Sequence, residues 1–142
     1  MPRAVIPTII SQCLAGNTVR LGSLEPTRDF TYVTDSVEGY LSAADADDAV
    51  GTTINLGSGR EVSIGDLARL IIRMTGGSAS IESHDERTRP EESEVERLLA
   101  DASLARSRLG WLPQVTLEDG LLRTIDWIRQ NPERFRPDRY TI

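Results

Sequence analysis

Lysine is absent from this chain of 142 residues, so all 16 of its basic side chains are arginines. The absence excludes a Schiff-base lysine, the lysine of a phosphate-binding loop and a catalytic Tyr-x-x-x-Lys pair. Arginine presents a planar fork of donors that matches phosphate and carboxylate oxygens, so the sequence still permits fixed binding of anions. A bias in genomic composition is the simplest reason for the missing lysines.

Cysteine and histidine each occur once, as Cys13 and His84. A single cysteine excludes an internal disulfide and is typical of a cytoplasmic protein. Cys13 lies on the apolar stripe of a predicted helix, where we expect it to pack rather than to react. His84 has no second metal-binding side chain and no suitably spaced serine and acid nearby, so neither a metal site nor a catalytic triad is expected.

Long apolar runs and an excess of positive charge are also missing. No run reaches the length of a membrane helix, and the first four residues do not resemble a signal peptide. The net charge of −6 argues against a general nucleic-acid or membrane-surface binder. With 39% apolar residues, the chain has the length and composition of one ordinary domain.

Apolar periodicity and capping residues predict an α/β fold in which short strands alternate with helices. Phe30, Tyr32 and Val33 predict a strand, and Thr34 the N-cap of a helix that runs to about residue 44. The other expected helices span residues 4–15, 63–75, 103–109 and 116–130, and the other expected strands 18–21, 52–56 and 78–82. The charged residues 84–97 are expected to form a solvated loop, and residues 133–142 an irregular tail after a single portion of 1–132.

Gly57 and Gly59 lie between a predicted strand and a predicted helix, an arrangement that resembles the opening of a dinucleotide-binding fingerprint. Val62 holds the third glycine position, and the helix begins too late to cradle a phosphate. No strand carries the acidic residue expected about 20 positions later. We therefore expect no cofactor-binding residue in this turn.

The segment 28–35, Arg-Asp-Phe-Thr-Tyr-Val-Thr-Asp, resembles a hallmark of the extended short-chain dehydrogenase/reductase family, the NAD-dependent nucleotide-sugar epimerases and dehydratases. Segments 54–59, 89–95 and 101–113 resemble further motifs of the same family, in the same order. Residues 89–98 are most similar to 4,6-dehydratases that act on amino-sugar nucleotides. The resemblance covers nearly the whole chain and implies the C-terminal part of a Rossmann-type enzyme, without the main dinucleotide-binding sheet.

This resemblance implies roles for two arginines and one strand. Arg28 and Arg89 match the positions that contact the diphosphate of a UDP-, GDP- or dTDP-linked sugar, because guanidinium groups pair with phosphate oxygens. Val19, Arg20 and Leu21 resemble the strand against which the nucleobase lies, with backbone groups reading its edge. Without the family, each arginine is more simply interpreted as part of a surface ion pair.

The family's cofactor domain would precede Met1, so the resemblance places NAD(P) in the full-length enzyme and none in this portion. No catalytic residue is expected here, since none of the tyrosines has a lysine four positions on. Residues 28–57 and 116–129 are expected to pack on the missing domain. The apolar side chains that would then lack partners, favouring self-association or a separate first half, are Val37, Tyr40, Ile54, Leu121 and Ile125.

Three interpretations of function remain open from the sequence. The first is the substrate-binding half of a nucleotide-sugar 4,6-dehydratase or epimerase, inactive alone. The second is a non-enzymatic module derived from such an enzyme, which binds a sugar nucleotide or a protein partner. The third, a small α/β scaffold without a ligand, requires all four motifs to be coincidental.

Overall fold

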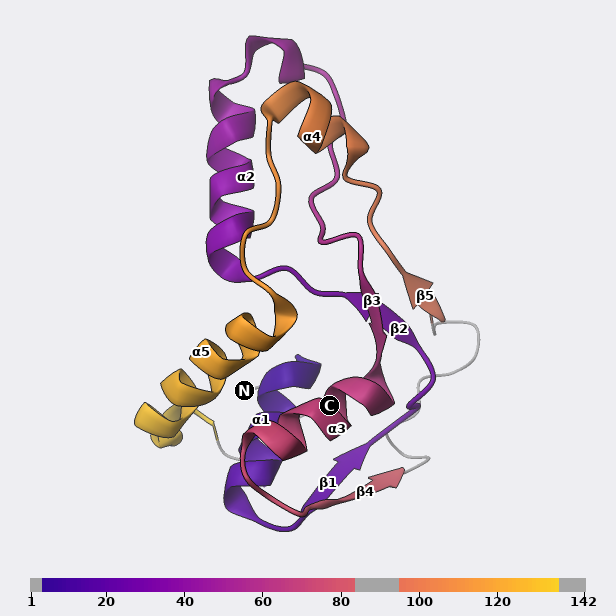
Figure 1. Cartoon of the computed structure of the whole chain (residues 1–142), viewed down its shortest axis with the longest axis vertical. Coiled ribbons are helices and arrows are strands. Elements are labelled where there is room, and N and C mark those ends of the chain that lie inside the picture. The colour runs from indigo at the N-terminus through magenta and orange to yellow at the C-terminus, as the bar shows by residue number, and fades with distance from the viewer. Residues whose placement is uncertain (1–3, 84–94, 136–142) are drawn as a thin grey trace. The chain divides into compact units, whose positions relative to one another are not determined.

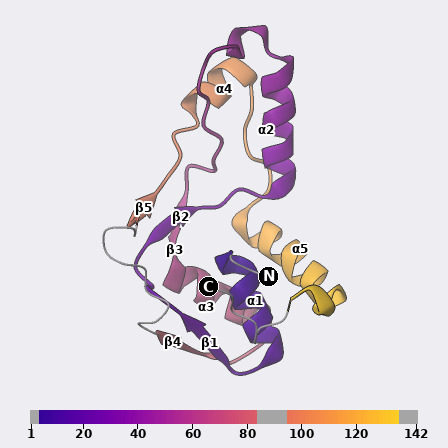
Figure 2. The same ribbon diagram turned by 180° about the vertical axis from the view of Figure 1, so that it is seen from behind.

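A computed structural model describes residues 4–83 and 95–135 of the chain (Figures 1 and 2). These residues form two compact units. The first unit comprises Met1–Pro26, Ser63–Glu96 and Leu121–Ile142, and the second comprises Thr27–Val62 and Arg97–Gly120. Within the described ranges, no helix is long and apolar enough to cross a membrane.

The first unit contains a parallel pair of strands and the helices that pack with it. Strand β1 (Thr18–Leu21) pairs in parallel with β4 (Ser80–Ser83), with Val19 opposite Ile81. Helix α1 (Val5–Ala15) contacts both β1 and helix α3 (Ile64–Met74). The fully buried side chains of this core include Ile9, Ile10, Val19, Leu67 and Ile71.

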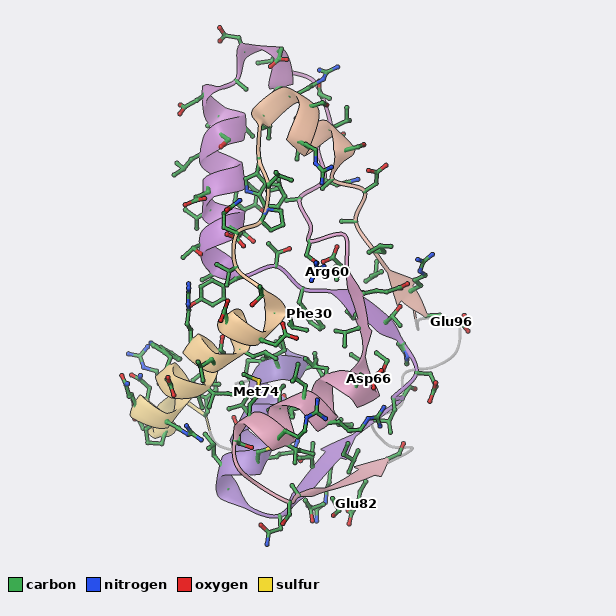
Figure 3. All side chains as sticks on the ribbon, in the orientation of Figure 1. Phe30, Arg60, Asp66, Met74, Glu82 and Glu96 are labelled. Atoms are coloured by element: carbon green, nitrogen blue, oxygen red, sulfur yellow. The ribbon has the colours of Figure 1, made fainter. Side chains whose placement is uncertain are left out.

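Local chemistry sets both ends of α3, as expected from the sequence. The Ser63 hydroxyl accepts a hydrogen bond from the Asp66 N–H at 3.0 Å and donates to the Asp66 carboxylate at 2.8 Å. Asp66 lies at the beginning of the helix and Met74 at its end (Figure 3). Gly76 follows with φ of 74°, the left-handed conformation that ends many helices.

Helix α5 (Leu117–Gln130) begins at the expected cap, since the Thr116 hydroxyl accepts from the Asp119 N–H at 3.1 Å. A short 3₁₀ turn, η4 (Pro132–Arg134), follows it. Leu121 and Ile125 are 2% and 0% exposed, so the expectation that they lack partners is wrong. Both belong to the first unit, whose core takes up the apolar stripe of α5 from residue 121 onward.

The second unit has a three-stranded sheet in the order β3-β2-β5. The central strand β2 (Thr27–Asp29) runs parallel to β5 (Arg97–Leu98), with Thr27 opposite Arg97. On the other side lies β3 (Glu61–Ser63). The Glu61 carboxylate joins all three strands, because it accepts hydrogen bonds from the Thr27 hydroxyl and from the Arg97 guanidinium, each at 2.8 Å.

Two helices complete the second unit. Helix α2 (Val33–Asp45) contacts α4 (Ser103–Leu109), and the short turn η1 (Asp47–Ala49) contacts both. Gly39 on α2 is buried, and a Cβ atom there would meet Leu56 and the Trp111 indole. The large apolar side chains that α2 exposes are Val33, Val37, Tyr40 and Leu41.

Two predicted strands are wrong. The strand assigned to Phe30–Val33 lies earlier, at Thr27–Asp29, and Thr34 is not the cap. The Tyr32 carbonyl already accepts from the Ser36 N–H at 3.1 Å, so the helix begins before Thr34. Residues 52–56 are irregular, because no described strand pairs with them and alternation alone cannot form a ladder.

Candidate functional site

The Asp29 side chain holds the glycine turn at residues 57–59 in place. In sequence this turn resembles a phosphate-binding loop. One carboxylate oxygen accepts hydrogen bonds from the Ser58 N–H at 3.0 Å and from the Ser58 hydroxyl. The other accepts from the Gly59 N–H at 3.0 Å and from the Ala100 N–H at 3.3 Å. A Cβ atom on Gly57 would collide with Ala100 and with the same carboxylate. The donors of this turn therefore hold a carboxylate of the protein itself.

Asp35, the second acid of the segment 28–35, has a similar role. Its residue is 2% exposed, and its carboxylate accepts from the Val115 N–H at 3.0 Å. Its backbone carbonyl accepts from the Trp111 indole N–H at 2.9 Å. Asp35 thus holds the segment 111–115 against the first turn of α2. The sequence did not predict this role, because the partner of the Asp35 carboxylate lies 80 positions later in the chain.

Arg28 lies on β2, directly before Asp29, and is half-buried. Its guanidinium donates to the Thr27 carbonyl at 2.8 Å. The strand that carries Arg28 is therefore held on one side by β5 and at its end by the Asp29 carboxylate. Arg89, the other arginine assigned to the diphosphate, lies outside the described residues.

The strand assigned to the nucleobase is β1, in the first unit. Val19 and Leu21 point into the core and are 0% and 5% exposed, whereas Arg20 is exposed and forms an ion pair with Glu82 at 3.5 Å. The Gln12 carboxamide forms hydrogen bonds with both backbone groups of Arg20. It accepts from the N–H at 2.7 Å and donates to the carbonyl at 3.3 Å. No pattern in the sequence indicates this role of Gln12.

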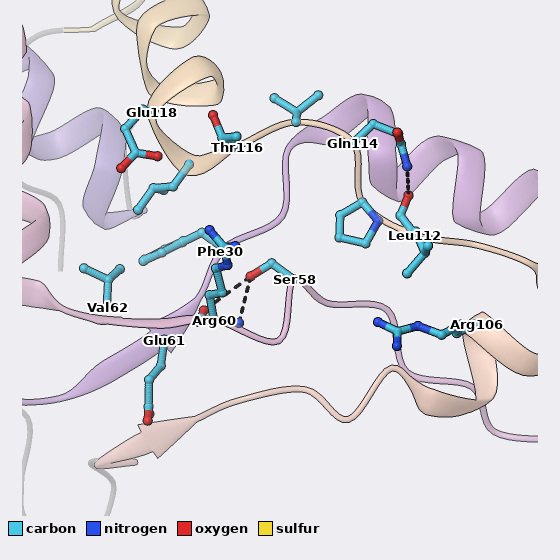
Figure 4. A pocket seen from close by; sticks show the side chains of 13 residues that line it. Phe30, Ser58, Arg60, Glu61, Val62, Arg106, Leu112, Gln114, Thr116 and Glu118 are labelled. Carbon is cyan, nitrogen blue, oxygen red and sulfur yellow. Dashed lines mark hydrogen bonds between the residues drawn. The ribbon is translucent and has the colours of Figure 1, made fainter.

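A pocket of about 460 Å³ lies wholly within the second unit (Figure 4). Arg60, next to β3, and Arg106, on α4, supply its positive charge. Its polar lining includes Ser58, Gln114 and Thr116. Its apolar walls are formed by Phe30, Val62, Leu112, Pro113, Val115 and Leu117. No candidate residue from the sequence lines this pocket, because its walls come from segments far apart in the chain.

Glu61 also lines the pocket, but its charge is engaged elsewhere. Figure 4 shows its side chain pointing toward β5, where Arg97 lies. Hydrogen bonds from Arg97, and to a smaller extent from Thr27, lower the pKa of Glu61 below its ordinary value of 4.5. A lowered folded-state pKa means that the contact stabilises the fold above about pH 4.5 and is lost as the pH falls through the folded-state pKa.

We therefore expect Glu61→Gln to flatten the acid limb of the stability profile. Melting temperatures of the two proteins, measured between about pH 6 and pH 3, should differ most at the upper end and converge toward the lower end. Profiles that stay parallel over this range would show that the ionised carboxylate contributes nothing to the sheet.

The described residues contain no group of side chains suited to a metal ion. Within residues 4–83 and 95–135, no three histidine, cysteine or acidic side chains are grouped so as to hold one.

The Cys13 thiol is not activated by its surroundings. Burial raises its pKa, partly offset by a hydrogen bond with Thr75, and a raised pKa lowers the thiolate fraction on which reactivity depends.

Comparisons with known proteins agree with this fold. Residues 1–124 match the family model described as GDP-mannose 4,6-dehydratase. Over 137 residues the chain is 34% identical to UDP-glucuronic acid decarboxylase 1 of Xenopus tropicalis. It superposes with a TM-score of 0.86 and 32% identity on an epimerase of Methanothermobacter thermautotrophicus. The TM-score is 0.83, at 30% identity, for UDP-glucuronic acid 4-epimerase of Bacillus cereus in complex with UDP-glucuronic acid and NAD.

The chain spans only part of these proteins. The matches include 96%, 97% and 92% of this chain, but 31% of the decarboxylase and 40% and 41% of the two epimerase chains. The α/β architecture expected from the sequence is confirmed, as is the resemblance to the extended epimerases and dehydratases.

Proposed function

Because this chain belongs to the GDP-mannose 4,6-dehydratase family of nucleotide-sugar epimerases and dehydratases, we propose that it is the substrate-binding portion of a 4,6-dehydratase or an epimerase. The match over residues 1–124 carries this proposal. In the matched region, Arg28 lies on β2, and the Asp29 carboxylate at the end of that strand bonds to the turn at residues 58–59 and to Ala100. Such a strand is a fixed base for a phosphate contact.

In this proposal Arg28 and Arg89 pair with the diphosphate of a nucleotide sugar, and β1 lies against the nucleobase. A guanidinium group can bond two phosphate oxygens at once, so the contacts orient the substrate as well as hold it. Any base read by the backbone of Arg20 must replace the Gln12 carboxamide, which already bonds to both groups.

NAD does not fit the glycine turn of this chain. The N–H groups of Ser58 and Gly59, which a cofactor diphosphate would need, are bonded to Asp29. We therefore derive no hydride-transfer step from these residues, and assign NAD and the catalytic groups to a cofactor domain outside them.

The surface of the second unit supports packing of residues 28–57 on such a domain. Helix α2 exposes Val37, Tyr40 and Leu41 to 49%, 70% and 60%, a stripe that ordinarily lies against another element. Residues 52–56 have strand-like alternation and no partner among the described strands. For residues 116–129, the exposed Leu122 and Trp127 are the candidates for this contact. Without the domain, self-association of the chain is expected.

Substitution of Arg28 tests the proposal. Calorimetric titration of the purified chain with UDP-glucose should show weak, saturable binding that Arg28→Ala weakens about tenfold or more, because a charge-assisted phosphate contact is lost. NAD should produce no heat of binding.

Arg73→Ala is the matched control, since it removes one exposed arginine of α3. Equal affinities for UDP-glucose in the two variants, or tight binding of NAD by the chain, would contradict the proposal. Circular dichroism of each variant separates lost binding from lost folding.

A further inference from the structure

The two arginines of the pocket differ from the other arginines of the second unit. That unit is described throughout and contains five arginines. Arg28 donates to the Thr27 carbonyl, Arg97 pairs with Glu61, and Arg108 donates to the Asp48 carbonyl at 2.9 Å. Within residues 27–62 and 97–120, the guanidinium groups of Arg60 and Arg106 have no hydrogen-bond or ion-pair partner, and both line the pocket.

Acidic side chains do not cancel this charge. Glu61 is held by Arg97 and Thr27 and points toward β5. The remaining carboxylate of the lining, Glu118, lies at the opposite end of the pocket from Arg106 in Figure 4. Two guanidinium groups and one carboxylate of the lining thus have no bonded partner among the described residues, so this part of the pocket is positive in a chain whose overall charge is −6. The positive charge attracts anions to the pocket.

The rest of the lining restricts what can bind. The Ser58 hydroxyl donates to Asp29 and the Thr116 hydroxyl to Asp119, and one N–H of the Gln114 amide donates to the Leu112 carbonyl. The charged donors of the lining that have no bonded partner among the described residues are the two guanidinium groups, which lie at separate places along the pocket (Figure 4). Apolar walls and a volume of about 460 Å³ are typical of sites for small organic molecules.

We propose that this pocket is a binding site for a small organic molecule with two anionic groups, phosphate or carboxylate, one for each of Arg60 and Arg106. Each planar guanidinium bonds two oxygens of one group, and the carbon body of the ligand lies against Phe30, Leu112 and Pro113. The inference stands on the second unit alone and does not depend on the proposed nucleotide-sugar function.

Titration with fructose 1,6-bisphosphate and with citrate tests the site and distinguishes phosphate from carboxylate ligands. At least one of the two should bind saturably at about 1 mM or below, and Arg60→Gln and Arg106→Gln should each weaken that binding about tenfold. Arg73→Gln removes the same charge from α3, where the side chain has no bonded partner among the described residues, and should leave the affinity unchanged.

Backbone amide shifts locate the binding independently. In ¹⁵N spectra of the unsubstituted chain, addition of the bound anion should shift the amides of Arg60, Val115 and Thr116 more than those around Arg73. The inference is overturned if neither anion binds at millimolar concentration, if all three variants weaken binding equally, or if the shifts spread evenly over exposed arginines. Because neither pocket guanidinium has a bonded partner in the part of the chain that the structure describes, both variants should keep the fold.

Discussion

Asp29→Ala should lower the free energy of unfolding by about 3 kcal/mol, because it removes the acceptor of four hydrogen bonds and leaves three backbone N–H groups without their partner. The loss acts on two segments at once, the turn at Ser58–Gly59 and the chain at Ala100. Urea unfolding followed by circular dichroism measures it.

Two variants define the cause of that loss. Asp29→Asn keeps one acceptor oxygen but places its amide N–H donors against backbone N–H donors. Its free energy of unfolding should therefore lie between those of Asp29→Ala and the unsubstituted chain. Asp126→Ala removes an exposed carboxylate whose ion pair with Arg129 is 3.6 Å long, and should cost less than about 1 kcal/mol. If Asp29→Ala costs no more than Asp126→Ala, the turn does not depend on the carboxylate.

Trp111→Ala should cost about 3 to 5 kcal/mol, since the indole is 4% exposed and packs against α2 at Gly39. Trp111→Phe keeps most of the ring but loses the hydrogen bond to the Asp35 carbonyl, and should cost about 1 to 2 kcal/mol. Scanning calorimetry of the variants measures both losses.

Trp127→Ala provides the comparison for a tryptophan at the surface. Trp127 is 46% exposed and makes an edge contact with Phe135, their ring centroids 5.5 Å apart. We expect a loss of about 1 kcal/mol, which reflects the smaller area taken from water. Equal losses for the two tryptophans would show that burial of the Trp111 indole does not stabilise the second unit more than a surface tryptophan stabilises the first.

Features that depend on neighbouring residues could be predicted from the sequence. Ser63 and Thr116 cap helices because a hydroxyl reaches an N–H three positions on, and Gly110 ends α4 with φ of 60°. The segment 28–35 identified the family for a similar reason, since its motif is contiguous.

Features that depend on distant residues could not be predicted. Residues 52–56 alternate like a strand, but a ladder also needs a partner. Asp29 bonds to Ala100 and Asp35 to Val115, across 71 and 80 positions, and no local pattern shows such pairs. The burial of Leu121 and the pocket at Arg60 likewise arise only when separated segments meet.

The hydrogen bonds between the Gln12 carboxamide and the backbone of Arg20 also bear on whether β1 can pair with another chain. An edge strand with free N–H and carbonyl groups invites another chain to extend its sheet, and this is a common start of aggregation. Gln12 satisfies one donor and one acceptor of β1 with a side chain of the same chain. A strand from a second molecule would have to displace that carboxamide first, so the helix that packs against β1 also protects its edge.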